Sequence, residues 1–222
     1  PKTAIIVTGN ELIAPGNELQ HGQIYESNSI MLQSVLKKRG ITTISTYKSA
    51  DTFEETKTTI NAALENHDLV LISGGISVGD YDFVGKALNE LNTESLFYKV
   101  KQKPGKPLFF GKKDNTIVFA LPGNPASALS CFYHYVDKAI AQMSGDEDYE
   151  LRTLKAPAKN SFTKRGDRPQ FLKAKYSNNE VEILDGQNSS MLHTFAVSNA
   201  MVFIPGDQEK IEVGDIVKTI LI

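Results

Sequence analysis

Short apolar runs alternate with segments of helical periodicity over the first 143 residues. Residues 69–72 are continuously apolar, which is typical of a central parallel strand covered on both faces, and residues 3–7 predict a first strand. Helices are predicted at residues 27–39 and 51–66 and again after residue 82, where apolar positions recur at helical spacing. This alternation predicts a three-layer α/β domain with a mostly parallel sheet.

Three further strands are predicted at residues 96–100, 108–110 and 117–120. The connections between them are too short to hold helices, so at least one antiparallel pair is expected in the sheet. A long helix follows, to about residue 143, and Pro125 suits its first position.

The helical period ends near residue 145. Short strands separated by Asn, Asp and Gly turns follow at residues 154–158, 170–176, 181–184, 201–204 and 216–222. That spacing predicts a small all-β barrel or sandwich, of which we take the barrel as the expectation. We therefore expect an α/β domain over residues 1–145 and a β-barrel domain over residues 146–222.

Composition narrows the class of protein. The chain has 222 residues, 41% of them hydrophobic, and its net charge of −2 gives no overall attraction for nucleic acid. Cys131 is the single cysteine, which excludes an internal disulfide framework and favours a cytoplasmic protein. No apolar run approaches the ~20 residues that a membrane span needs. Pro1 opens the chain without an initiator Met, so we expect part of a longer protein.

The stretch at residues 69–91 carries the strongest functional signal. Ser73, Gly74 and Gly75 end the apolar strand, and Asp80 and Asp82 follow before the next helix. Ligands bind at the carboxyl edge of such sheets, so a glycine loop with two acids indicates a site there. Asp82 also has a purely structural interpretation, because Asp is a favoured N-cap.

A nucleotide-binding P-loop is excluded at this position. Gly74 and Gly79 have the G-x-x-x-x-G spacing of that motif. Asp80 and Tyr81, however, replace the Lys and the Ser or Thr that the phosphates and magnesium require.

Other strand ends add candidate side chains. Glu11 presents a carboxylate after the first strand. Asp51 lies just before a helix, where a capping box with Glu54 would explain it without any functional role. The turn from Pro122 to Pro125 leaves backbone N–H groups at a helix start, which favours phosphate or oxyanion binding.

Lysines are concentrated between residues 99 and 106. In an extended segment Lys99, Lys101 and Lys103 would share one side and concentrate positive charge for an anion. A solvated surface is the ordinary alternative. Two polar loops of the second domain stand out at residues 164–168 and 185–190. Ordinary turn chemistry explains them as well as a functional role does.

Five motifs in order resemble a single family. TGNE, GQIYESNS, SGGISVGDYD, KVKQKPGKP and LPGNPASAL follow one another as in the carboxyl-terminal half of the MoeA family, the molybdopterin molybdotransferases. The resemblance spans the whole α/β domain and is weaker in the β domain. It implies a protein that inserts molybdate into adenylylated molybdopterin and releases AMP with the help of Mg²⁺.

The resemblance also implies roles for particular residues. The catalytic set it implies is Glu11, Asp51, Asp82, Lys99 and Lys103, with Asp51 and Asp82 holding Mg²⁺. The substrate-binding set is Ser73, Gly74, Gly75, Ser77, Asp80, Lys106, Pro122, Gly123, Asn124, Pro125, Arg168 and Ser190. These charges suit the reaction, because lysines hold anions and carboxylates hold Mg²⁺. Asn10 departs from the family, which usually has Asp there, although Glu11 keeps a carboxylate in the same turn.

Family members carry further domains ahead of this segment, and those of a partner protomer close the active site. The resemblance therefore implies a homodimer in the full-length protein, with a molybdopterin adenylyltransferase as a further partner. Two alternatives stay open. One is a molybdopterin adenylyltransferase-like enzyme that consumes ATP, and the other is a non-catalytic scaffold whose β domain binds partner peptides.

Overall fold

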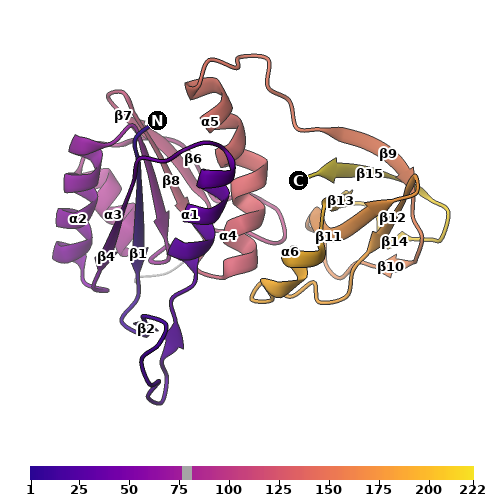
Figure 1. Cartoon of the computed structure of the whole chain (residues 1–222), viewed down its shortest axis with the longest axis horizontal. Helices are drawn as coiled ribbons and strands as arrows, with labels where there is room; N and C mark the ends of the chain where they lie inside the picture. The colour runs from indigo at the N-terminus through magenta and orange to yellow at the C-terminus, as the bar shows by residue number, and fades with distance from the viewer. Residues whose placement is uncertain (77–81) are drawn as a thin grey trace. The chain divides into compact units, whose positions relative to one another are not determined.

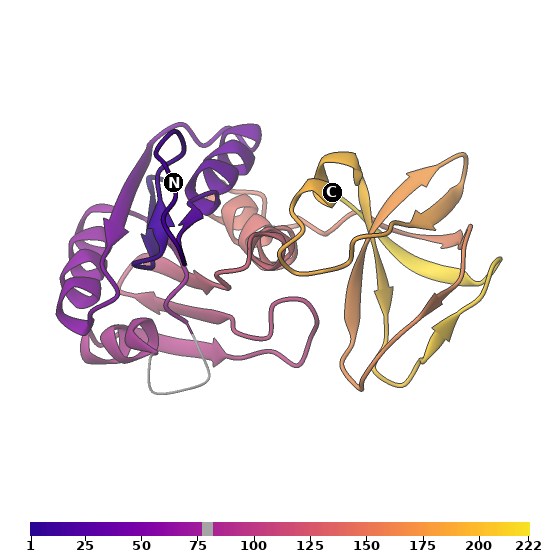
Figure 2. The same ribbon diagram turned by 90° about the horizontal axis from the view of Figure 1, so that it is seen from below.

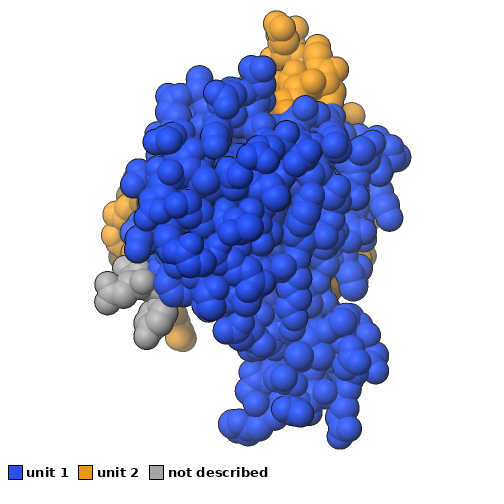
Figure 3. All heavy atoms as spheres, turned by 90° about the vertical axis from the view of Figure 1, so that its left-hand side faces the viewer, with its two compact units in different colours: residues 1–100, 107–129 blue, residues 101–106, 130–222 orange. Residues whose placement is uncertain are grey.

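The computed structural model describes residues 1–76 and 82–222 of the chain. It contains two compact units (Figure 3). Unit 1 comprises Pro1–Val100 and Pro107–Leu129, and unit 2 comprises Lys101–Lys106 and Ser130–Ile222. The lysine-rich segment is thus divided between the units, and the domain boundary predicted between residues 145 and 146 stays a prediction.

Unit 1 is built on a six-stranded sheet with the order β4-β1-β5-β8-β7-β6. Its four parallel strands are paired side by side, and β7 and β6 continue the sheet as antiparallel strands. The mostly parallel sheet and the antiparallel pair predicted from the sequence are confirmed. The strands are β1 (Thr3–Thr8), β4 (Ile44–Ser49), β5 (Leu69–Ser73), β6 (Glu94–Tyr98), β7 (Phe109–Lys113) and β8 (Thr116–Leu121).

Helices cover both faces of this sheet, which confirms the three layers. Helices α2 (Phe53–Asn66) and α3 (Phe83–Glu90) lie on one face, and α1 (Asn28–Lys38) lies on the other (Figure 1). Strand β5 is buried at every residue because it is central and covered twice. Helix α4 (Pro125–Cys131) starts at the proline predicted for its first position.

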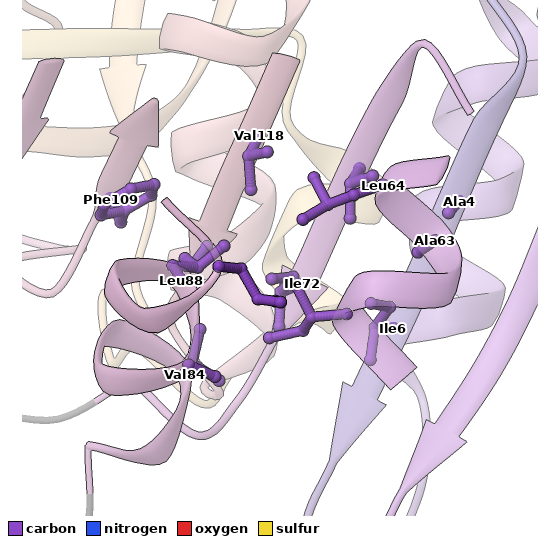
Figure 4. Packing of buried hydrophobic residues seen from close by; sticks show 14 of the residues in the cluster. Ala4, Ile6, Ala63, Leu64, Ile72, Val84, Leu88, Phe109 and Val118 are labelled. Carbon is purple, nitrogen blue, oxygen red and sulfur yellow. The ribbon is translucent and has the colours of Figure 1, made fainter. Parts of the chain in front are cut away.

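The alternation of strand side chains explains the core of unit 1. Every second residue of a strand points to the same face, so alternate residues of β1, β5 and β8 meet α2 and α3 (Figure 4). The cluster includes Ala4, Ile6, Val70, Ile72, Val118 and Ala120 from these strands and Ala63, Leu64, Val84 and Leu88 from the two helices. All ten are at most 6% exposed, so this packing holds the strand ends in place.

A small parallel sheet of β2 (Leu12–Ile13) and β3 (Ile24–Tyr25) extends beyond the end of β1 (Figure 1). Ile24 and Tyr25 are 54% and 47% exposed. Two-residue strands carry too little periodicity to be predicted from the sequence.

Unit 2 is built on a five-stranded antiparallel sheet with the order β12-β11-β13-β15-β9. The sheet curls (Figure 2), and a bridge between Ala158 and Val181 connects its two outer strands. The predicted β domain is confirmed as this curled sheet, although the short helix α6 (His193–Val197) was not predicted. The strands are β9 (Thr153–Pro157), β11 (Gln170–Ser177), β12 (Glu180–Ile183), β13 (Ala200–Ile204) and β15 (Ile216–Leu221), with β10 (Phe162–Thr163) and β14 (Lys210–Ile211) as a separate pair.

The long helix predicted to residue 143 contains a π-helical turn, η1 (Phe132–Val136), before α5 (Asp137–Met143). None of the helices in the described part of the chain is long and apolar enough to cross a membrane. The π-turn carries His134, whose ring centre lies 3.9 Å from that of Phe171. Within residues 1–76 and 82–222 its buried Nε2 has no hydrogen-bond partner. Burial, followed by the charge of Lys218, lowers the pKa of His134 to about 4.

Acid should therefore destabilise the chain through His134. An ordinary histidine titrates near 6.5, so between that pH and about 4 the unfolded chain binds the extra proton and the folded chain does not. The free energy of unfolding should fall as the pH drops through this window, by roughly 2–3 kcal/mol from this group. Urea unfolding at several pH values should show a flatter pH dependence for His134→Phe.

The exposed His193, on α6 of the same unit, supplies the control. His193→Gln should keep the wild-type pH dependence. Equal slopes for wild type and His134→Phe would show that His134 does not resist protonation.

Candidate functional site

The carboxyl ends of β1, β5 and β8 lie side by side at one edge of the unit 1 sheet. In the parallel register Ser73 pairs with Val7 on one side and with Leu121 on the other. The Gly74 N–H donates to the Leu121 carbonyl at 3.4 Å. A Cβ added to Gly123 would lie 3.6 Å from the Gly74 Cα, which is ordinary contact. The glycine turn at residues 73–75 and the loop at residues 122–125 therefore meet at this edge.

The two glycines of the turn are needed for backbone shape and close packing. Gly74 and Gly75 have φ angles of 91° and 62°, in the left-handed region. A Cβ on Gly74 would lie 2.6 Å from the Thr8 carbonyl oxygen, and one on Gly75 would lie 2.7 Å from Thr8 Oγ1 and from Val84 Cγ2. A side chain at either position would therefore clash with protein atoms, so packing and backbone shape both require glycine here.

Asn28, the first residue of α1, joins these two loops. Its Nδ2 donates to Ser73 Oγ at 2.7 Å and to the Gly123 carbonyl at 2.8 Å. The side chain is 9% exposed. The sequence indicated only a helix start here, and the GQIYESNS motif was the one signal that could have drawn attention to this residue.

Asp82 is the N-cap of α3, as its structural interpretation predicted. One carboxylate oxygen accepts the Gly85 N–H at 2.9 Å, and the other accepts the Tyr98 hydroxyl. The Nζ of Lys99 lies 4.8 Å from the centre of the Tyr98 ring. Asp82, Tyr98 and Lys99 thus form a connected polar group within unit 1.

Asp51 is not a helix cap. Helix α2 has Thr52 as its N-cap, so the predicted capping box with Glu54 is wrong by one position. No side chain caps the helix at Thr52, and Glu55 Oε1 instead accepts the N–H of Ala50, which precedes the helix, at 3.1 Å. Within the described ranges the carboxylate of Asp51 has no hydrogen-bond or ion-pair partner, so the local fold does not use its charge.

Asn10 connects the ends of the neighbouring strands β1 and β4. Its Oδ1 accepts the Asp51 N–H at 3.1 Å, a contact that either Asn or Asp can make. The Asn at this position therefore keeps the acceptor while removing one negative charge. Glu11 follows in the same turn, and its exposed carboxylate has no hydrogen-bond or ion-pair partner among the residues described.

The lysine-rich segment is not a continuous extended strand. Strand β6 ends at Tyr98, and Lys99 has a φ of 67°, which turns the backbone. Lys101 forms an ion pair of 2.7 Å with Asp167 in unit 2. The prediction that Lys99, Lys101 and Lys103 share one side is therefore wrong, because the left-handed residue interrupts the alternation.

Unit 2 brings Lys103 and Arg168 together. The Lys103 N–H donates to the Pro169 carbonyl, and the Phe171 N–H donates to the Lys103 carbonyl, each at 2.9 Å. Arg168 Nη1 donates to the Gln102 carbonyl at 3.1 Å. The side chains of Lys103 and Lys106 are exposed and, in the described part of the chain, have no acidic partner.

The loop that carries Ser190 is held in place by Lys173, a residue that the sequence analysis did not single out. Lys173, 4% exposed, donates from Nζ to the carbonyls of Asn188 and Met191 at 3.1 and 3.0 Å. Burial lowers the pKa of Lys173 to about 8. Ser190 is exposed, and its N–H and hydroxyl both donate to Asn188 Oδ1. Ser77 and Asp80 lie outside the described residues.

Comparison with known families matches residues 4–142 to the probable molybdopterin binding domain. Residues 155–222 match the MoeA C-terminal region, domain IV. The chain belongs to the MoeA family.

Individual MoeA relatives support the same assignment. Molybdopterin molybdenumtransferase of Staphylococcus epidermidis is 32% identical over 100% of this chain and 54% of its own length. The protein of the same name from Haemophilus influenzae is 34% identical over 97% of this chain and 55% of its own length. The crystal structure of the molybdopterin biosynthesis MoeA protein from Pyrococcus horikosii has a TM-score of 0.82 at 31% identity, over 100% of this chain and 54% of that chain. The chain thus spans about half the length of these relatives.

The oxygen donors of this MoeA chain suit a hard cation. No group of three or more His, Cys, Asp or Glu side chains that could hold a metal occurs within residues 1–76 and 82–222. Mg²⁺ does not need such a group, since it is usually held by one or two carboxylates together with water and substrate phosphates. The unpartnered carboxylate of Asp51 fits that requirement best. Asp82 is a second carboxylate of unit 1, held in place by the Gly85 N–H and the Tyr98 hydroxyl.

Two lysines of the MoeA segment should differ in anion binding. Lys103 has no acidic partner among the described residues, whereas Lys101 is already paired with Asp167. Lys103→Ala should weaken the binding of molybdate by roughly tenfold, the loss expected for a charge-assisted contact of ~1.5 kcal/mol. Lys101→Ala should change it by less than about twofold, as is common for an exposed ion pair.

Isothermal titration at low and high salt measures both effects. The loss in Lys103→Ala should be greater at low salt, where the charge is less screened. Equal losses in the two variants would show that only the overall charge of the segment matters.

Proposed function

We propose that this chain carries substrate-binding and catalytic residues of a molybdopterin molybdenumtransferase, which inserts molybdate into adenylylated molybdopterin and releases AMP. The observation that carries the proposal is the meeting of the glycine turn and the Gly123 loop at one sheet edge. The names of the relatives give the reaction class, and both family matches cover the parts expected of such a protein.

Each unit, taken by itself, carries charged side chains that suit this reaction. Unit 1 offers carboxylates at its strand ends, of which Asp51 and Glu11 are not used by the local fold. Unit 2 offers Lys103, Lys106 and Arg168 for the anionic molybdate and phosphate groups. Lys99 adds a positive charge beside Tyr98 in unit 1.

Asp51 and Asp82 would hold Mg²⁺ in this site. When bound, the ion would neutralise the negative charge that develops as the phosphoric anhydride breaks and AMP leaves. Tyr98 and the Gly85 N–H fix the orientation of Asp82, and the Asn10 side chain fixes the backbone of Asp51. These contacts hold both residues in position, and the one at Asp51 involves its backbone N–H and not its carboxylate.

The adenylyltransferase alternative is less well supported. It accounts for the α/β unit, but the match of residues 155–222 to the MoeA C-terminal region favours the molybdenumtransferase. A scaffold without activity is also less well supported, because the relatives that match over the whole chain are named molybdopterin molybdenumtransferase. We further propose that the natural full-length protein is a homodimer and that it receives its substrate from a molybdopterin adenylyltransferase.

AMP release by the natural full-length protein tests the proposal. With adenylylated molybdopterin, molybdate and Mg²⁺, the wild type should release AMP, and release should depend on molybdate. Asp51→Asn should lower the rate about a hundredfold, because the amide preserves size and removes the charge that favours the cation. The effect should be accompanied by a higher Mg²⁺ requirement.

Asp68→Asn is the matched control, because Asp68 lies just before β5, at the opposite end of that strand. It should release AMP at the wild-type rate. ATP consumption without molybdate would contradict the proposed reaction, and a wild-type rate with wild-type Mg²⁺ dependence in Asp51→Asn would remove that residue from the site.

A further inference from the structure

We propose that Asn28 is a positioning residue of the substrate site, which locks the glycine turn at residues 73–75 to the Gly123 loop at the spacing needed to bind an anionic group. This inference rests on the proposed function, since it assigns the two loops a common ligand. The Asn28 side chain contacts segments 45 and 95 residues away in sequence. It therefore connects α1, the end of β5 and the loop before α4.

Asn28 does not serve its own helix. The N-cap of α1 is Ser27, and no side-chain cap bond is made there. Glu26 instead accepts from the first turn, with Oε1 receiving the Ser29 N–H at 2.8 Å and Oε2 receiving the Ser29 hydroxyl. The amide of Asn28 is thus committed to the two loops.

The orientation of this amide is fixed by chemistry. The Gly123 carbonyl only accepts hydrogen bonds, so the NH₂ group of Asn28 must face it. The same NH₂ group donates to Ser73 Oγ, which leaves the hydrogen of the Ser73 hydroxyl available for another acceptor. An anion bound at the turn is an acceptor of that kind.

The arrangement leaves an acceptor unsatisfied. Asn28 Oδ1 is buried and has no partner in the described part of the chain, and the same is true of Thr8 Oγ1, which lies beside the glycine turn. A buried acceptor without a partner destabilises the folded chain. Such costs are concentrated at functional sites, where geometry rather than stability selects the residue. The unsatisfied Oδ1 is thus the consequence of placing the donor group of Asn28 between the two loops.

Thr116 provides a matched control at the opposite edge of the sheet. Its buried hydroxyl lies within 3.2 Å of the Leu64 carbonyl and 2.8 Å of the His67 carbonyl, and it joins distant segments as Asn28 does. Thr116→Val removes a hydroxyl and Asn28→Ala removes an amide, and each of these groups lies within hydrogen-bond distance of two partners. The two variants should lose similar stability and differ only in ligand binding.

AMP binding to the natural full-length protein, measured by isothermal titration, tests the inference. Asn28→Ala and the isosteric Asn28→Asp, which cannot donate to Gly123, should each bind AMP about tenfold more weakly than wild type, whereas Thr116→Val should stay within about twofold. Amide hydrogen exchange should accelerate at Gly74 and Gly123 in the Asn28 variants only.

The outcomes separate the two proposals. Wild-type protein that does not bind AMP would overturn the proposed function, and with it the role given to Asn28. If the wild type binds AMP and the Asn28 variants bind it equally well, the positioning role alone is overturned. An equal loss of affinity in Thr116→Val would also overturn it, because the effect would then reflect general stability.

Discussion

The parallel pairing of β1, β5 and β8 is the constraint on which the site depends. Because the three strands run in the same direction, their carboxyl ends reach one edge together, and each end continues into a loop with polar or glycine residues. The buried cluster against α2 and α3 fixes the register of these strands. A slip of one residue would turn Ile6 and Ile72 away from the helices and move the glycine turn off the Gly123 loop.

Hydrogen bonds and ion pairs decide which polar residues serve the fold and which remain available to bind a ligand. Asp82 caps α3 and accepts a hydrogen bond from Tyr98, and Lys101 forms an ion pair with Asp167. Asp51, in contrast, lies just before the N-cap of α2, and its carboxylate has no hydrogen-bond or ion-pair partner in the described residues. Carboxylates and lysines that look alike in the sequence therefore differ in what they can offer a ligand.

Most of the fold could be predicted from the sequence because its signals are local. The buried run of β5, the helical spacing after Asp82 and the proline that starts α4 each depend on a few neighbouring residues. The errors arose where the outcome depended on distant groups or on one backbone angle. The left-handed backbone at Lys99 ended the expected alternation of the lysine side chains. The Asn28 side chain donates hydrogen bonds to residues 45 and 95 positions away. Lys173 was missed for the same reason, since its partners lie in a separate loop.

A crystal structure of the protein grown with AMP tests the central claim most directly, namely that the meeting of the glycine turn and the Gly123 loop forms a ligand site. The proposed site predicts electron density for the phosphate beside residues 73–75 and Gly123, with the Asn28 amide still bonded to both loops. Density for AMP at the opposite edge of the sheet, near Thr116, would contradict it.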